Sequence, residues 1–263
     1  MKSADNKLFV YEKNQIIETI CQLRFPPILT IEAKEPADFQ EVIRETFPRY
    51  ECRAEKLPAG SSGEAQTMKN HNFISTDGTC KLSLTKNFIA LSTVRYAGWE
   101  SFANLLDEPL GQFIRIYKPA FFERIGLRFL NGFSREKLGL TGRRWNDLLQ
   151  PQYLSVLDDD DIEENSVAKC SVDVERKLDA GCGIKIHAGP GSIRRTVRTG
   201  SGVQTIQEPE PRFILDLDVF SSTGNIQLQD AAKTLEQLHG YADQIFSDAI
   251  TDTLHEAMEP VEL

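Results

Sequence analysis

The stretch over residues 73–117 constrains the fold of this chain most strongly, because its hydrophobic period changes partway along. Two runs, CKLSLT and FIALST, alternate apolar residues with polar ones, which is typical of half-buried strands. Asp77 and Gly78 precede the first run and supply the positive-φ residue of a tight turn. From Trp99 onward, large apolar residues recur at helical spacing. The stretch therefore predicts a meander of strands followed by a helix that lies across it.

Aromatic residues are concentrated in this predicted helix and just after it. Such a stripe either lines a ligand cavity between helix and sheet or fills the core, and core packing is the more common role. Pro109 interrupts the helical pattern and lacks a backbone N–H, so we expect a kink or a break near Asp107 and Glu108. The aromatic positions are Trp99, Phe102, Phe113, Tyr117, Phe121 and Phe122.

The alternation typical of strands and the spacing typical of helices assign secondary structure to most of the remaining chain. In the first predicted strand, Ile17, Thr19 and Cys21 share one face and Glu18 lies on the other. Pro, Gly and Ser residues within 52–70 predict a loop. Further strands are predicted over residues 16–25, 121–133, 168–177, 183–187 and 213–220. Further helices are predicted over residues 35–47, 144–153 and 228–258.

Both halves of the chain run as several strands followed by a long helix. This order predicts an α+β fold in which antiparallel β-sheets are covered by long helices, and it suggests an internal duplication. An acidic run at residues 158–164 is typical of a solvated linker. We therefore expect an N-terminal α+β half over residues 1–157 and a C-terminal half of β-sheet plus long helix over residues 158–263, with one continuous domain as the alternative.

Charge and cysteine content argue against several classes of protein. The chain has 39 acidic and 30 basic residues, a net charge of -9, so a general nucleic-acid-binding surface is not favoured. Its five cysteines are spread widely without a CxxC pair, and the N-terminus lacks an apolar signal region. No apolar run is long enough to cross a bilayer. We expect a cytoplasmic protein with no membrane contact.

Four carboxylates on two predicted strands are the best candidates for chemistry. Asp216 and Asp218 point the same way, because residues two apart on a strand share a face, and Asp173 and Glu175 repeat this arrangement. If all four converge, they form a hard-cation site of a metal-dependent hydrolase or nuclease. Ion pairs with Arg124 and Arg128 on another strand explain the same pattern without a metal. The sequence leaves both alternatives open.

Arginine residues mark two candidate sites for an anionic ligand. Arg194, Arg195 and Arg198 lie among Gly, Ser and Thr, which favours either an anion-binding loop or a flexible surface loop. Arg124 and Arg128 share the polar face of another predicted strand, and they form a charged pocket if that face is covered. A small anionic ligand, or a role as a small-molecule or nucleotide sensor, would use these side chains.

Motifs for common cofactors and catalytic groups are absent from the sequence. No Walker lysine follows a glycine-rich loop, no glycine fingerprint for a dinucleotide is complete, and neither HExxH nor GxSxG occurs. Cys170, Cys182 and His187 would need a distant fourth ligand to bind zinc, so buried thiols and an ordinary histidine are the simpler interpretation. We expect no cofactor and no metal site, and these absences favour a protein that is not an enzyme.

Several segments resemble a family of sporadically distributed bacterial proteins of similar length. They are IIETICQLRFPP, LSLTKNFIALSTVRYAGWESF, RIGLRFLN and LEQLHGYADQIFSDAITDTLHEAM, which extend over nearly the whole chain. The family has no assigned function, so the resemblance transfers no catalytic residue. It implies a horizontally moving gene, as in defence or toxin–antitoxin systems.

The leading functional expectation is a non-enzymatic binding or protein-interaction component of such a bacterial system. A protein partner or self-association would use the long helix expected over residues 228–258. The alternatives are a metal-dependent hydrolase or nuclease that uses the four strand-borne carboxylates, and a small-molecule or nucleotide sensor.

Overall fold

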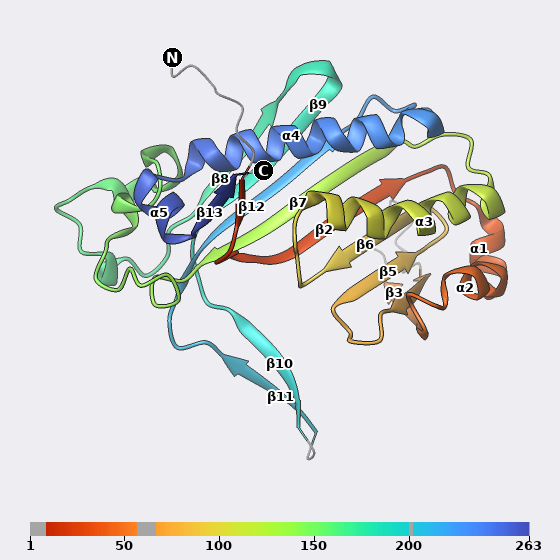
Figure 1. The fold of residues 1–263 in the computed structure, drawn as a ribbon, viewed down its shortest axis with the longest axis horizontal. Helices are drawn as coiled ribbons and strands as arrows, with labels where there is room; N and C mark the ends of the chain where they lie inside the picture. Colours follow the sequence, from red (N-terminus) through yellow and green to blue (C-terminus); the bar gives the residue numbers. More distant parts are fainter. Residues whose placement is uncertain (1–8, 57–66, 200–201, 263) are drawn as a thin grey trace.

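A nine-stranded antiparallel sheet forms the body of the molecule (Figure 1). The computed structural model describes residues 9–56, 67–199 and 202–262. The strand order is β3-β4-β5-β6-β2-β7-β12-β9-β8, which confirms the predicted α+β class with antiparallel strands. The strands are β2 (Ile16–Arg24), β3 (Arg49–Lys56), β4 (Thr67–Ile74), β5 (Cys80–Leu84), β6 (Phe88–Thr93), β7 (Arg124–Phe133), β8 (Val172–Lys177), β9 (Cys182–Gly191) and β12 (Arg212–Ser221).

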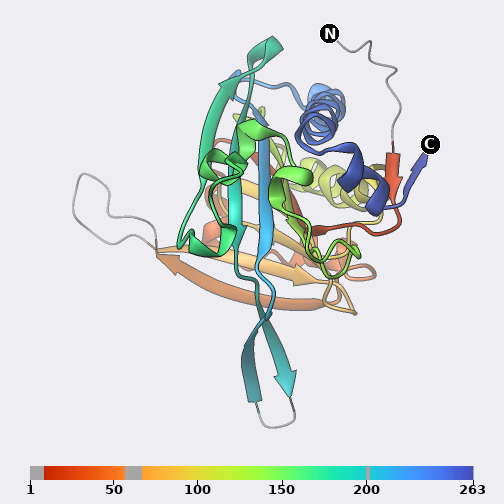
Figure 2. The ribbon, with the colours of Figure 1, turned by 90° about the vertical axis from the view of Figure 1, so that its left-hand side faces the viewer.

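Two smaller antiparallel pairs accompany the large sheet. One joins β1 (Phe9–Tyr11) to β13 (Pro260–Glu262), so the first and last described elements lie side by side. The other joins β10 (Arg194–Thr199) to β11 (Gly202–Gln207). The β10–β11 hairpin leaves the sheet between β9 and β12 and projects away from it (Figure 2).

The order of elements repeats along the chain. In the first repeat, β2 is followed by α1 (Leu29–Ala33), α2 (Ala37–Ile43), the strands β3 to β6 and α3 (Trp99–Tyr117). In the second repeat, β7 is followed by short 3-10 turns, β8, β9, β12 and α4 (Ala231–Ala249). The sheet order β4-β5-β6-β2 is matched by β8-β9-β12-β7, and β2 pairs with β7 at the centre. The topology therefore has the form that an internal duplication produces, and the second repeat begins at β7.

Alternation along the central strands separates a core face from a charged face. On β7, Leu127 and Phe129 are buried whereas Arg128 is exposed. Cys21 on β2 lies opposite Leu127 and is also fully buried. Because the side-chain period of a strand is two, this register places the fully buried apolar positions of the two strands beneath the helices.

Both long helices cover the same face of the sheet (Figures 1 and 2). α4 packs on β7 and β12 through a stripe of buried residues. α3 covers the β2–β6 side, where the rings of Phe113 and Phe25 lie 4.8 Å apart. None of the helices in the described part of the chain is long and apolar enough to cross a membrane. The stripe on α4 consists of Ala231, Leu235, Leu238, Ala242, Ile245 and Ala249.

The prediction of a single helix over residues 228–258 is wrong, because the structure has two helices there. α4 is followed by α5 (Asp252–Ala257), and between them Ile250 has an extended backbone with φ -98° and ψ 156°. Ile250 forms a β-bridge with Leu149, and the Thr251 side chain caps α5. Ile250 is itself buried, so the apolar spacing continues through the break and conceals it in the sequence.

Three other helix predictions also differ from the structure. The helix expected over residues 144–153 is replaced by short 3-10 turns, and α2 covers only part of residues 35–47. α3 continues through Pro109, so the break expected near Asp107 and Glu108 does not occur. Pro109 lies on the buried stripe of α3, where packing against the core offsets the lost hydrogen bond. The two 3-10 turns in residues 144–153 are Trp145–Asp147 and Pro151–Tyr153. The other 3-10 turns of the described chain are Ser155–Asp158, Glu164–Ser166, Asp179–Gly181 and Leu228–Asp230.

Two predicted loops contain strands instead. The ends of the loop expected over residues 52–70 belong to β3 and β4, and residues 57–66 lie outside the described part. The surface loop expected around Arg194, Arg195 and Arg198 is the β10 strand of the hairpin. β10 pairs with β11 in a two-stranded sheet of its own, so hydrogen bonds within the hairpin give this segment its regular backbone.

A β-bulge corrects the face assigned to Ile17. The pairing of β2 with β7 shifts between Ile16 and Glu18, so Ile17 is the extra residue. A Cβ placed on Gly132 would meet the Ile17 side chain, which therefore lies on the charged face of the sheet rather than with Thr19. As a result, Ile16 turns toward the helix side.

Candidate functional site

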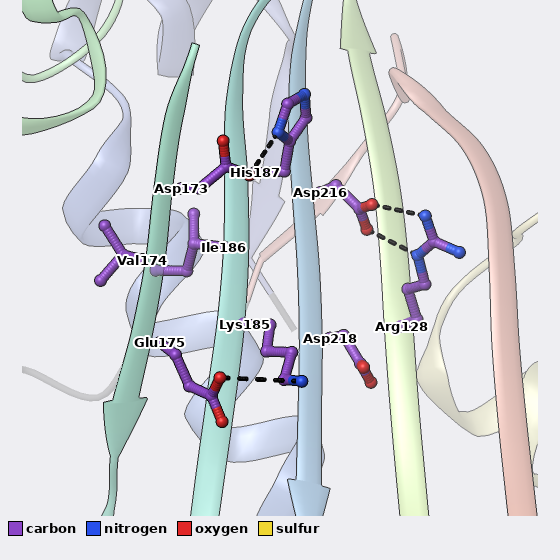
Figure 3. Close-up of a pocket in the computed structure, with 9 residues that line it drawn as sticks. All are labelled: Arg128, Asp173, Val174, Glu175, Lys185, Ile186, His187, Asp216 and Asp218. Atoms are coloured by element: carbon purple, nitrogen blue, oxygen red, sulfur yellow. Dashed lines mark hydrogen bonds and ion pairs between the residues drawn. The ribbon is translucent and has the colours of Figure 1, made fainter. Parts of the chain in front are cut away.

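The four predicted carboxylates line one shallow hollow on the charged face of the sheet, here called the sheet hollow (Figure 3). Asp216 lies opposite His187, which lies opposite Asp173, across β12, β9 and β8. Asp218, Lys185 and Glu175 form the next row. The hollow has a volume of about 400 Å³, and Arg128 on β7 closes one side.

Each carboxylate of the sheet hollow has a basic partner. Arg128 donates to both oxygens of Asp216, at 2.7 Å from Nε and 2.5 Å from its terminal nitrogen. The Arg124 guanidinium donates to Asp218 at 3.0 Å. On the outer strands, His187 Nδ1 lies 2.7 Å from Asp173, and Lys185 Nζ lies 3.7 Å from Glu175. These cross-strand contacts compete with a metal for the carboxylate oxygens.

The described residues contain no group of three or more His, Cys, Asp or Glu side chains that could hold a metal ion. Hydrogen bonding to Asp216 raises the pKa of Arg128, so the guanidinium stays charged at all ordinary pH values. The arrangement is that of a charged sheet surface whose ion pairs fix side-chain positions.

We expect Mg²⁺ and Mn²⁺ to leave the melting temperature unchanged, because the carboxylates of the sheet hollow are already paired. Asp216→Ala should lower the free energy of unfolding by about 1–3 kcal/mol, since it leaves Arg128 without its hydrogen-bonded partner. The matched control is Glu175→Ala, whose exposed pair with Lys185 should be worth less than about 1 kcal/mol. A cation-dependent rise in melting temperature that Asp216→Ala removes would show that a metal site exists.

The five predicted anion-binding arginines do not form one site. Arg124 and Arg128 lie on β7 and bind aspartates of β12. Arg194, Arg195 and Arg198 lie on β10 in the separate hairpin. The two groups therefore belong to different parts of the molecule, and the β7 pair already has anionic partners within the chain.

A second cavity lies between the sheet and the helices, and we call it the helix-side cavity. Its volume is about 420 Å³, and β1, α4, the start of α3 and the central strands β2, β7 and β12 supply its walls. This volume lies in the range typical of small-molecule sites. Six aromatic residues contribute to the wall: Phe9, Tyr11, Tyr96, Trp99, Phe129 and Phe246.

Local backbone features place these side chains around the cavity. Gly98 has φ 129°, which L residues rarely adopt, and it turns the chain so that Trp99 begins α3 at the cavity wall. The β2 bulge brings Ile16 to the same wall. β1 is held over the cavity by its pairing with β13 and by a 2.9 Å hydrogen bond between Tyr11 Oη and His255 Nδ1.

A carboxyl group and a neutral imidazole meet in this cavity. Burial lowers the pKa of His239 to about 4, so its ring is uncharged at pH 7. Its Nε2 lies 3.3 Å from Asp243, and its ring stacks on Trp99 with centroids 4.3 Å apart. Burial raises the pKa of Asp243 to about 6. Burial, and to a lesser extent the charge of Asp243, raise the pKa of Tyr11 to about 12 and also raise that of Tyr96.

Further polar groups are fixed at the edge of the cavity. Trp99 Nε1 donates to both oxygens of Glu236 at 2.9 Å, which joins α3 to α4 across the opening. Asn131 is almost fully buried and donates to the Leu215 carbonyl at 3.0 Å. The Asp243 side chain is 42% exposed, so a ligand can reach it from solvent.

The aromatic stripe identified in the sequence divides between core and cavity. Phe102, Phe113 and Phe122 are buried in the core, whereas Trp99 lines the cavity. The sequence analysis did not identify His239 or Asp243 as site residues. One signal was available, since a polar pair four residues apart borders the apolar stripe of α4.

Comparisons of the chain with models of protein families and with curated proteins find no match. The candidate site is therefore defined by its own geometry and chemistry.

Proposed function

We propose that this protein is a non-enzymatic binding protein that takes a small organic molecule into the helix-side cavity. The observation that carries the proposal is a cavity of about 420 Å³ whose walls combine six aromatic rings with a few fixed polar groups. Largely apolar walls with few convergent polar groups are typical of ligand sites. The ligand would act as a signal or cargo within a bacterial system of the kind suggested by the sequence resemblance.

Two observations favour this function over the alternatives. The carboxylates of the sheet hollow have basic partners, which leaves little support for the metal-dependent hydrolase. The apolar stripe of α4 packs on β7 and β12. The sheet therefore covers the hydrophobic face of this helix, which is not free to bind a protein partner. Association with a protein partner is a secondary proposal, in which ligand binding would control the association.

Calorimetric titration with indole, tryptamine and indole-3-acetate tests the proposed function, because the three share one flat ring. At least one should bind with one molecule per chain at millimolar concentration or tighter. Ala242→Phe should abolish this binding, since Ala242 is buried at the cavity wall and a ring there fills the space. A ligand at a hundredfold excess over its dissociation constant should also stabilise the wild type by about 2.7 kcal/mol.

Ala232→Phe is the matched control, because it makes the same change at an exposed position of the same helix. It should retain the binding. Ser101→Phe, at an exposed position of the cavity wall on α3, is a second blocking variant if Ala242→Phe does not fold. Failure of all three probes to bind, or equal binding in both blocking variants, would refute the proposed function.

A further inference from the structure

We propose that the helix-side cavity selects an organic cation, with its apolar body among the aromatic rings and its ammonium group beside Asp243. The inference rests on the proposed function and names the class of ligand for the same site. Three features of the wall lead to it: the signs of its charges, the nature of its rings and the contacts already made by its polar groups.

The charged side chains on the cavity wall are acidic. Glu100, Glu236 and Asp243 line it, and none of its lining residues within the described chain is Lys or Arg. Among the described wall residues, His239 is the one side chain that could become positively charged, and burial keeps it neutral at pH 7. Because a site of low dielectric strengthens electrostatic interactions, an unbalanced set of carboxylates attracts a cation and repels an anion.

Asp243 is the carboxylate best placed to bind the ligand. Glu236 already accepts the single N–H of Trp99 Nε1, which is shared between its two carboxylate oxygens. Asp243 lines the cavity, lies 3.3 Å from His239 Nε2 and keeps 42% of its side-chain surface exposed. A carboxylate without a full set of donors gains most from an ammonium group, which brings up to three.

The aromatic wall supports the same class of ligand. Tyr11 and Phe246 meet edge to face at 5.8 Å, and Tyr96 and Phe129 do so at 5.6 Å. Rings that face a cavity attract cations through their quadrupoles, and such aromatic cages are a common way to bind ammonium groups. The rings therefore add attraction for a cation to the apolar contact that any flat molecule would gain.

The start of α3, at the described part of the wall, is a feature that would favour an anion. The unpaired N–H groups at a helix N-terminus carry a partial positive charge. Glu100 lies in the first turn of α3 and offsets this charge. Glu236 is also held at the start of α3, by its hydrogen bond from Trp99. The balance at this wall therefore remains negative.

Calorimetric titration of the three indole compounds at pH 7.5 tests the inference, since they differ in charge. Tryptamine, a cation, should bind at least about tenfold more tightly than neutral indole. Indole-3-acetate should bind more weakly than indole. Asp243→Asn should remove most of the advantage of tryptamine and leave the affinity for indole unchanged, whereas Asp248→Asn should change neither, because this exposed residue of α4 lies outside the cavity.

The outcomes separate the inference from the proposed function. Binding of indole or indole-3-acetate as tight as that of tryptamine, blocked by Ala242→Phe, would overturn the inference and leave the proposed function intact. Binding of none of the compounds would overturn both. An advantage of tryptamine that survives Asp243→Asn would also overturn the assignment of Asp243.

Discussion

Replacing Leu127 with alanine is expected to lower the free energy of unfolding by about 2–5 kcal/mol. Leu127 is fully buried on β7, where it lies opposite Cys21 of β2 and Val219 of β12. It is therefore at the junction of the two repeats, beneath the helices, and a cavity left there cannot be filled from the surface. Urea denaturation followed by circular dichroism measures the loss.

Leu130→Ala is the matched control, because it removes the same atoms from the opposite face of the same strand. Leu130 is partly exposed and pairs with Glu18 and Asp216 on the charged side. Its replacement should cost about 1 kcal/mol or less, since little apolar area is lost. Equal losses at the two positions would mean that the charged face is covered in solution, contrary to the fold.

The central strands of the large sheet were predictable because their environment imposes a local pattern. On β7 and β12, one face meets the helices and the other carries charge, so apolar and polar residues alternate. Among the described strands, β10 and β11 pair with each other in a sheet separate from the large one. The glycine and arginine content of this hairpin resembled a loop, although its backbone is regular.

The break between α4 and α5 shows where periodicity fails. Helical spacing reports which residues are buried, and Ile250 and Leu254 are both buried. It does not report that Ile250 leaves the helix to bridge Leu149, about a hundred residues earlier in the chain. Contacts of this range belong to the tertiary structure and have no local signature.

The same reasoning explains which of the two sites the sequence could indicate. The carboxylates of the sheet hollow lie two residues apart on strands, so period two predicts their shared face. Their arginine partners depend on the register of β7 against β12, which the sequence does not give. The helix-side cavity joins Tyr11, Trp99 and Asp243 from three distant segments, and only the fold brings them together.

His239 and Asp243 are expected to change the stability of the protein in opposite directions as pH rises. Burial lowers the pKa of His239 to about 4, so the unfolded chain binds more protons and stability rises with pH up to the ordinary histidine range. Burial raises the pKa of Asp243 to about 6, so the folded chain binds more protons and stability falls with pH in nearly the same window. In the wild type the two effects partly cancel.

Single substitutions should expose each effect. Relative to wild type, His239→Gln should lose stability as pH rises from 4 to 7, by roughly 2–3 kcal/mol at 1.36 kcal/mol per pKa unit. Asp243→Asn should instead gain stability over the same range, because it removes the cost of a desolvated charge. The gain should be smaller, since the Asp243 side chain is 42% exposed and solvent screens it.

Urea denaturation at a series of pH values between 4 and 7 measures these differences, and the double variant provides the control. His239→Gln combined with Asp243→Asn removes both effects, so its stability relative to wild type should change less with pH than that of His239→Gln alone. Slopes of the same sign in the two single variants would mean that the groups do not share the buried environment of the cavity. Opposite slopes would show a carboxylate and an imidazole held at a cost in stability, as a ligand site requires and as core packing alone does not.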